Sequence, residues 1–168
     1  MKYDDASWHY DGTFPDDLPK EAGATHIGMY FAWAVLSDLT SDEFAADSAE
    51  AIRQVKTYGQ TPGQWMLAHF DGVFTSDDLD EEGNVFTRAY YADDDGMRHG
   101  GHSYYDDYHV QFRIGKGDFY RVSDRWSNFY HLRSRLDARL AIFRQTGKLV
   151  LPKGETLKID GKPVVPPG

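Results

Sequence analysis

The longest apolar stretch of the chain spans residues 24–39, and its pattern predicts a buried helix. Its apolar side chains would surround the helix axis instead of lining one stripe, which is typical of a helix that neighbouring elements cover on most sides. The most apolar part, residues 27–36, has 10 residues, half of the roughly 20 that a membrane-spanning helix requires. We therefore expect this stretch to be the centre of a globular core.

Helix start and stop signals follow this stretch twice. Thr40 and Glu43 have the capping-box spacing ahead of apolar residues at helical intervals, and Gly59 fits a left-handed stop. Thr61 and Gln64 repeat the start signal, with a proline at the first helical position between them. These signals predict one helix that ends near Gly59 and a shorter one that begins after Thr61.

The rest of the chain has one ambiguous segment between two clearer helices. Residues 76–91 place acidic residues in a first turn and apolar residues on one side, which indicates a helix. Residues 102–114 alternate apolar and polar positions as a half-buried strand does, but their aromatic spacing also fits a helix, so both structures stay open. A long helix is then predicted with Ser123 or Asp124 as its cap and Gly147 at its end.

Together these elements predict a mainly helical α+β fold in a single domain. The length of 168 residues suits one domain that can bury a sizeable core. We expect an aromatic and acidic loop at residues 1–23, a helical core at 24–145, and a tail of short strands at 148–168.

The amino-acid composition and the first residues indicate the cellular compartment in which we expect the protein. The sequence contains no cysteine, which excludes disulfides, thiolate metal ligands and a cysteine nucleophile and fits a reducing compartment. The first residues carry a lysine and two acids without an apolar run, so we expect no secretory signal. We therefore expect a cytoplasmic protein.

Charge is divided unevenly along the chain. Residues 1–84 hold 17 acidic and 4 basic residues, whereas residues 85–168 hold 10 acidic and 14 basic residues, for a net charge of −9. An acidic field repels nucleic acid and anionic membranes and attracts basic proteins. We expect a basic protein as the partner, and neither nucleic acid nor a membrane.

Two acidic clusters are candidates for the partner-binding surface. Aromatic rings anchor protein interfaces and carboxylates pair with basic side chains, so we favour the N-terminal cluster, in which both occur. The candidate residues are Asp4, Asp5, Trp8, His9, Tyr10 and Asp11 in the first cluster and Asp77, Asp78 and Asp80 in the second.

One segment carries residue types that could ligate a metal ion. Imidazole and carboxylate ligands occur within residues 99–109, as His99, His102, Asp106, Asp107 and His109. Their spacing matches no zinc signature, and the glycine-rich loop before them favours solvent-exposed histidines.

Another acidic segment resembles a calcium loop only in part. The pattern Asp78-x-Asp80-x-Glu82 starts like an EF-hand, but the twelfth position, which must supply a bidentate carboxylate, is Ala89. We therefore expect the protein to have no metal ion or other cofactor.

His26 is the polar exception within the apolar stretch. It lies one helical turn before Tyr30 and two before Trp33, so it could reach into a cleft as a functional histidine. We favour a structural role, in which a buried imidazole hydrogen-bonds to a backbone carbonyl group.

Several segments resemble an uncharacterised family of small acidic bacterial proteins. The resemblance lies in residues 3–10, 14–15, 24–33, 83–91, 105–108 and 120–126. It spans about residues 3–145 and leaves out the C-terminal tail. It implies no established activity and no catalytic residues, but by analogy it suggests immunity proteins of contact-dependent or secreted toxin systems.

We therefore expect a protein-binding immunity protein or inhibitor that neutralises a basic bacterial toxin, and not an enzyme. Electrostatic complementarity would speed capture and a few buried rings would hold the complex. The alternative is a small metal-dependent hydrolase that uses residues 99–109. A regulatory or scaffolding module stays open as a third function.

Overall fold

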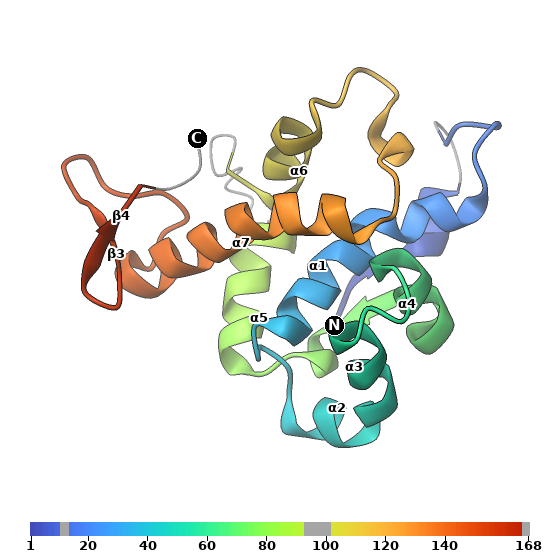
Figure 1. Ribbon diagram of the computed structural model, residues 1–168, viewed down its shortest axis with the longest axis horizontal. Coiled ribbons are helices and arrows are strands. Elements are labelled where there is room, and N and C mark those ends of the chain that lie inside the picture. Colours follow the sequence, from blue (N-terminus) through green and yellow to red (C-terminus); the bar gives the residue numbers. More distant parts are fainter. Residues whose placement is uncertain (11–13, 93–101, 166–168) are drawn as a thin grey trace.

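The computed structural model of the protein describes residues 1–10, 14–92 and 102–165 and confirms a mainly helical α+β fold in a single domain (Figure 1). In chain order, the strands and α-helices are β1 (Lys2–Asp5), α1 (Thr25–Leu36), α2 (Asp42–Asp47), α3 (Ala49–Lys56), α4 (Pro62–Phe70), β2 (Val73–Thr75), α5 (Glu81–Thr87), α6 (Tyr104–Phe112), α7 (Trp126–Thr146), β3 (Leu157–Ile159) and β4 (Lys162–Val164). Short 3-10 turns lie at Ala6–His9, Lys20–Ala24, Ser76–Asp78 and Phe119–Arg121, and a π-helical turn lies at Arg88–Ala92.

Helix α1 is the centre of the core, as its apolar pattern predicts. Every residue from Thr25 to Val35 is buried. Helix α4 packs so closely on α1 that a Cβ atom on Gly28 would lie 2.3 Å from the carbonyl oxygen of Pro62. Figure 1 shows α7 crossing α1 in front and the β3–β4 hairpin at the far end of α7.

The predicted helix between Thr40 and Gly59 is wrong in its details. Ser41 is the cap, because its hydroxyl accepts the backbone N–H of Phe44, and the helix is divided at Ser48 into α2 and α3. The left-handed residue at its end is Tyr58, with φ of 58°, and not Gly59. Thr40 forms an isolated β-bridge with Leu79, so a tertiary contact takes it away from the helix start.

Other helix signals are confirmed. The Thr61–Gln64 capping box begins α4 with Pro62 in its first turn, and Gly147 ends α7 with φ of 68°. The ambiguous segment is helix α6, which begins with a capping box between Ser103 and Asp106.

Two helix starts differ from the prediction. Neither Ser123 nor Asp124 caps α7, whose N-cap residue is Arg125. Asp124 instead accepts the backbone N–H groups of Gly63 and Gln64 and the hydroxyl of Thr61 at the start of α4. The helix predicted at 76–91 consists of a 3-10 turn, α5 and a π-helical turn.

The first residues form a strand that sequence periodicity did not reveal. Strand β1 pairs antiparallel with β2, with Asp4 opposite Phe74 and Asp5 opposite Val73. This pairing fixes the start of the segment predicted as a loop at residues 1–23 against the core. The strands β3 and β4 form the second sheet, within the predicted short-strand tail.

No helix in the described parts of the chain has both the length and the apolar character needed to cross a membrane.

The Trp33 side chain is fully buried in this core and donates from Nε1 to Asp137 Oδ1 of α7 at 2.8 Å. We predict that Trp33→Ala lowers the free energy of unfolding by about 3–5 kcal/mol, because it leaves a large cavity. Trp8, which is 58 % exposed, is the matched control, and Trp8→Ala should change stability by at most about 0.5 kcal/mol. Urea denaturation measures both values, and similar losses for the two variants would contradict the assigned core.

Candidate functional site

The N-terminal cluster of candidate binding residues is split between the interior and the surface. Asp4 and Asp5 are 3 % and 8 % exposed, so burial removes them from the predicted partner-binding surface. Pairing of β1 with β2 holds Asp4 against the core, whereas the Asp5 carboxylate is covered by its contacts with Lys2 and Ser7. Trp8 stays exposed, His9 and Tyr10 are half-buried, and Asp11 lies outside the described residues.

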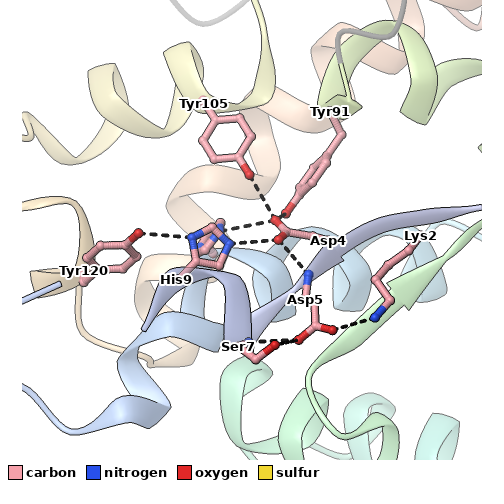
Figure 2. Close-up of polar contacts among 9 residues, drawn as sticks. Lys2, Asp4, Asp5, Ser7, His9, Tyr91, Tyr105 and Tyr120 are labelled. Carbon is pink, nitrogen blue, oxygen red and sulfur yellow. Dashed lines mark hydrogen bonds and ion pairs between the residues drawn. The ribbon is translucent and has the colours of Figure 1, made fainter. Parts of the chain in front are cut away.

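The Asp4 carboxylate is the centre of a buried polar cluster. Its Oδ1 atom lies 2.8 Å from His9 Nε2 and accepts the backbone N–H of Asp5 at 2.8 Å. Its Oδ2 atom accepts the hydroxyls of Tyr91 at 2.5 Å and Tyr105 at 3.0 Å. Figure 2 shows His9, Tyr91 and Tyr105 pointing toward this carboxylate. A neighbouring backbone N–H, an imidazole and two tyrosine hydroxyls from distant segments thus compensate one buried negative charge.

The other ring nitrogen of His9 extends the cluster. His9 Nδ1 lies 3.1 Å from the Tyr120 hydroxyl, which completes a chain of hydrogen bonds from Asp4 through His9 to Tyr120. A tyrosine hydroxyl can donate or accept, so Tyr120 is compatible with either neutral tautomer of His9.

His26 is buried in α1, as a structural role requires, but its Nε2 atom has no hydrogen-bond partner. This atom lies 3.5 Å from Asp4 Oδ2, which is too long for a well-formed hydrogen bond. The rings of His9 and His26 meet edge-on with centroids 4.5 Å apart. The expected backbone carbonyl is therefore not the partner of Nε2, which faces the Asp4 carboxylate.

Burial and contacts set the protonation states in this cluster. Burial alone would raise the pKa of Asp4, but the adjacent His26 and His9 rings and the Tyr91 hydroxyl outweigh it and hold the pKa below its ordinary value. Burial lowers the pKa of His26, although the Asp4 charge opposes this shift. The cluster therefore contains an ionised carboxylate and, at neutral pH, an uncharged His26.

Asp4, His9 and His26 also form the only group of three His and acidic side chains among the described residues that are close enough to share a metal ion. Their ligand atoms lie within 4.8 Å of one another. Periodicity gave no reason to group residues 4, 9 and 26, because they come from β1, a 3-10 turn and α1. The one available signal was a histidine within an otherwise apolar helix.

The second predicted acidic cluster is exposed only in part. Asp78 accepts the backbone N–H and hydroxyl of Thr75, and Asp80 caps α5 by accepting the N–H of Gly83. Asp77 is exposed. Two of the three acids thus have structural roles at helix starts, which sequence reasoning did not assign to them.

A different set of exposed carboxylates comes together around Asp77. The Thr40–Leu79 bridge, with hydrogen bonds from Ser41 to the carbonyl oxygens of Asp77 and Asp78, holds the start of α2 beside the start of α5. Five exposed acids lie on these two segments, and we call them the acidic surface: Asp38, Asp42, Glu43, Asp77 and Glu81. None of the five has an ion-pair partner within the described parts of the chain.

The segment at residues 99–109 does not form the metal site of the alternative hydrolase, as far as it is described. His99 lies outside the described residues, and Asp106 is engaged in the cap of α6. Asp107 is buried and accepts both Nε and Nη2 of Arg139, at 2.6 and 2.9 Å. His109 is exposed, and its Nδ1 donates to the Tyr105 carbonyl oxygen. Asp106, Asp107 and His109 therefore have other hydrogen-bond partners and are not grouped around a common site.

Arg139 and Arg144 of α7 each form a bidentate ion pair with one carboxylate, one pair buried and the other exposed. Comparing them shows how burial changes the contribution of an ion pair to stability. Arg139→Met should lower the free energy of unfolding by about 3 kcal/mol, because it removes the bidentate counterion of the buried Asp107 carboxylate. The Tyr90 hydroxyl at 2.8 Å and Arg135 Nη1 at 3.9 Å remain as its partners. Arg144→Met removes an exposed pair with Glu82 and should cost at most about 1 kcal/mol. Chemical denaturation distinguishes the two, and an equal cost would contradict the burial of Asp107.

Comparison with known proteins identifies a family match. A family model described as Domain of unknown function (DUF7832) matches residues 2–122, which include β1 to α6 and every residue of the Asp4 cluster. Neither a curated protein nor a solved structure matches the chain significantly.

Proposed function

The chain belongs to the DUF7832 family, a family of unknown function, and we propose that it acts as a binding protein that captures a basic protein partner through the acidic surface. In this proposal it works as an immunity protein or inhibitor does, by covering the functional cleft of the partner. The lack of cysteine fits action in a reducing compartment such as the cytoplasm.

The observation that carries the proposal is the set of unpaired carboxylates on the acidic surface. Several exposed acids elsewhere have arginine partners: Glu50 pairs with Arg53, Glu82 with Arg144 and Asp17 with Arg121. Among the described residues, exposed acids without an ion pair also occur elsewhere, as at Asp16 and Glu155, so the acidic surface is distinguished by having five on two adjacent segments. Like charges held together without ion-pair partners repel one another and create a field that draws in basic molecules. The N-terminal ammonium group donates to Ser76 Oγ, beside Asp77, and it offsets only one of these five charges. A basic partner would supply the missing counterions.

The exposed indole ring of Trp8 is connected to the acidic surface through Lys2 and strand β2. Trp8 is in contact with Lys2, whose Nζ lies 5.5 Å from the ring centroid. Lys2 lies opposite Thr75 in the β1–β2 pair, two residues before Asp77. Tryptophan is prominent among the residues that contribute most to protein–protein affinity. Trp8 can therefore contribute an apolar contact next to the charged one.

The proposal predicts that association depends on the acidic surface and on salt. The test variant is Glu43→Lys with Asp77→Lys and Glu81→Lys, which leaves the capping residues Asp78 and Asp80 intact. At about 0.1 M salt, where the screening length is about 10 Å, it should bind a partner captured from the source cells roughly tenfold more slowly than the wild type. The dissociation rate should change less, and the difference should shrink toward 1 M salt.

The matched control has the same change in net charge at exposed acids elsewhere, Asp16→Lys with Glu21→Lys and Glu155→Lys. Its association rate should stay close to that of the wild type. Circular dichroism verifies that both variants fold. If the two variants associate equally fast, or if the wild-type rate is indifferent to salt, the acidic surface is not the capture site.

A further inference from the structure

The arrangement of the Asp4 cluster calls for an explanation that the acidic surface does not give. An ionised carboxylate and two imidazoles converge within the core, and their ligand atoms lie within 4.8 Å of one another. Donor atoms about 2.1 Å from a tetrahedral metal ion lie about 3.4 Å apart. His26 Nε2 is already 3.5 Å from Asp4 Oδ2, and His9 Nε2 is 2.8 Å from Oδ1. Small side-chain movements would therefore bring all three within ligand distance of one ion.

The unpartnered nitrogen of His26 is the observation that points to a ligand. A buried polar atom without a hydrogen-bond partner destabilises the folded state, and native structures avoid such atoms unless water, an ion or a functional role accounts for them. Nε2 of His26 is aimed at the Asp4 carboxylate from a side chain that is 1 % exposed. A bond to a metal ion would satisfy this atom directly.

The surrounding hydroxyls have the arrangement of an outer coordination shell. Metal-bound carboxylates and imidazoles are held by further hydrogen bonds that fix their orientation. Tyr91 and Tyr105 donate to Asp4, and Tyr120 lies 3.1 Å from Nδ1 of His9. If His9 binds metal through Nε2, its proton resides on Nδ1, and the Tyr120 oxygen can accept it.

The exposure of the three side chains indicates how an ion would reach the cluster. The His9 side chain retains 17 % exposure, whereas those of Asp4 and His26 retain 4 % and 1 %. An ion would therefore enter past His9.

We propose that Asp4, His9 and His26 bind one divalent transition-metal ion through a carboxylate oxygen and the two Nε2 atoms. Two nitrogens and one oxygen without a thiolate suit ions such as Zn²⁺ and Fe²⁺ better than Mg²⁺ or Ca²⁺, which favour all-oxygen sites. Three protein ligands leave a coordination position open for water or another small ligand. This site is independent of the proposed binding surface, because it shares no residue with it.

Metal titration of the full-length protein tests the site. After chelator treatment and dialysis, the wild type should bind about one Zn²⁺ per chain by calorimetry and elemental analysis. Co²⁺ should give visible absorption bands of a site with mixed nitrogen and oxygen ligands. Zn²⁺ at a hundred times its Kd should raise the Tm by roughly 5–10 °C.

Variants locate the bound ion. His9→Gln and His26→Gln should each weaken Zn²⁺ binding at least a hundredfold, whereas His69→Gln and His109→Gln, at exposed histidines, should bind as the wild type does. Tyr120→Phe keeps all three ligands and should weaken binding by roughly 10- to 100-fold without changing the stoichiometry. Should His26→Gln fail to fold, the half-buried His9 and Tyr120 variants still decide the question.

Two results would overturn the site: absence of stoichiometric Zn²⁺ and Co²⁺ binding by the folded wild type, or wild-type affinity in folded His9→Gln. The acidic-surface variant Glu43→Lys with Asp77→Lys and Glu81→Lys should bind Zn²⁺ normally. Failure of metal binding and failure of partner capture are therefore distinguishable.

Discussion

Helix α1 carries apolar side chains on every side, and the need to remove all of them from water decides where the other elements lie. A helix with one apolar stripe can rest on a single neighbour, whereas α1 must be covered all round. Helix α4 approaches it backbone to backbone at Gly28, α7 crosses it, and β1 and β2 are joined beside it. The large aromatic content of the chain fills the spaces between these elements.

Covering α1 completely also brings polar groups into the core, and each needs a partner there. Asp4 lies on β1 and is buried there. Its charge is compensated by a histidine, two tyrosine hydroxyls and a backbone N–H group. Asp107 is compensated by Arg139 in the same way. His26 Nε2 is the exception, as the one buried side-chain nitrogen or oxygen in the described residues without a hydrogen-bond partner. Because the other buried side-chain polar atoms of the described residues have hydrogen-bond partners, this atom is the one that indicates a missing ligand.

The two proposals place partner binding on the surface of the molecule and metal binding in its core. In the first proposal, the acidic surface meets the partner, and contacts between the starts of α2 and α5 hold its two segments together. The Asp4 cluster is within the core and is coupled to several elements at once. A metal ion there would link β1 to α1 and would leave the acidic surface unchanged.

The sequence by itself determined the features that depend on local pattern. The apolar run identified α1, Thr61 with Gln64 located the start of α4, and Gly147 marked the end of α7, because periodicity and capping act over a few neighbouring residues. The charge division also follows from the sequence. Tertiary structure alone decided that Thr40 bridges to Leu79, that Asp124 caps α4 from a distance, and which acids are exposed.

The candidate sites belong to this second group. In the sequence, Asp4 and Asp5 resemble an exposed acidic cluster. Asp4 is buried by the pairing of β1 with β2, about 70 residues later in the chain, and by contacts with Tyr91 and Tyr105. That same pairing brings Asp4 to His26, whose role is not determined by its position in an apolar helix. Local signals cannot specify such contacts, because their free energy comes from groups far apart in the sequence that meet only when the core is complete.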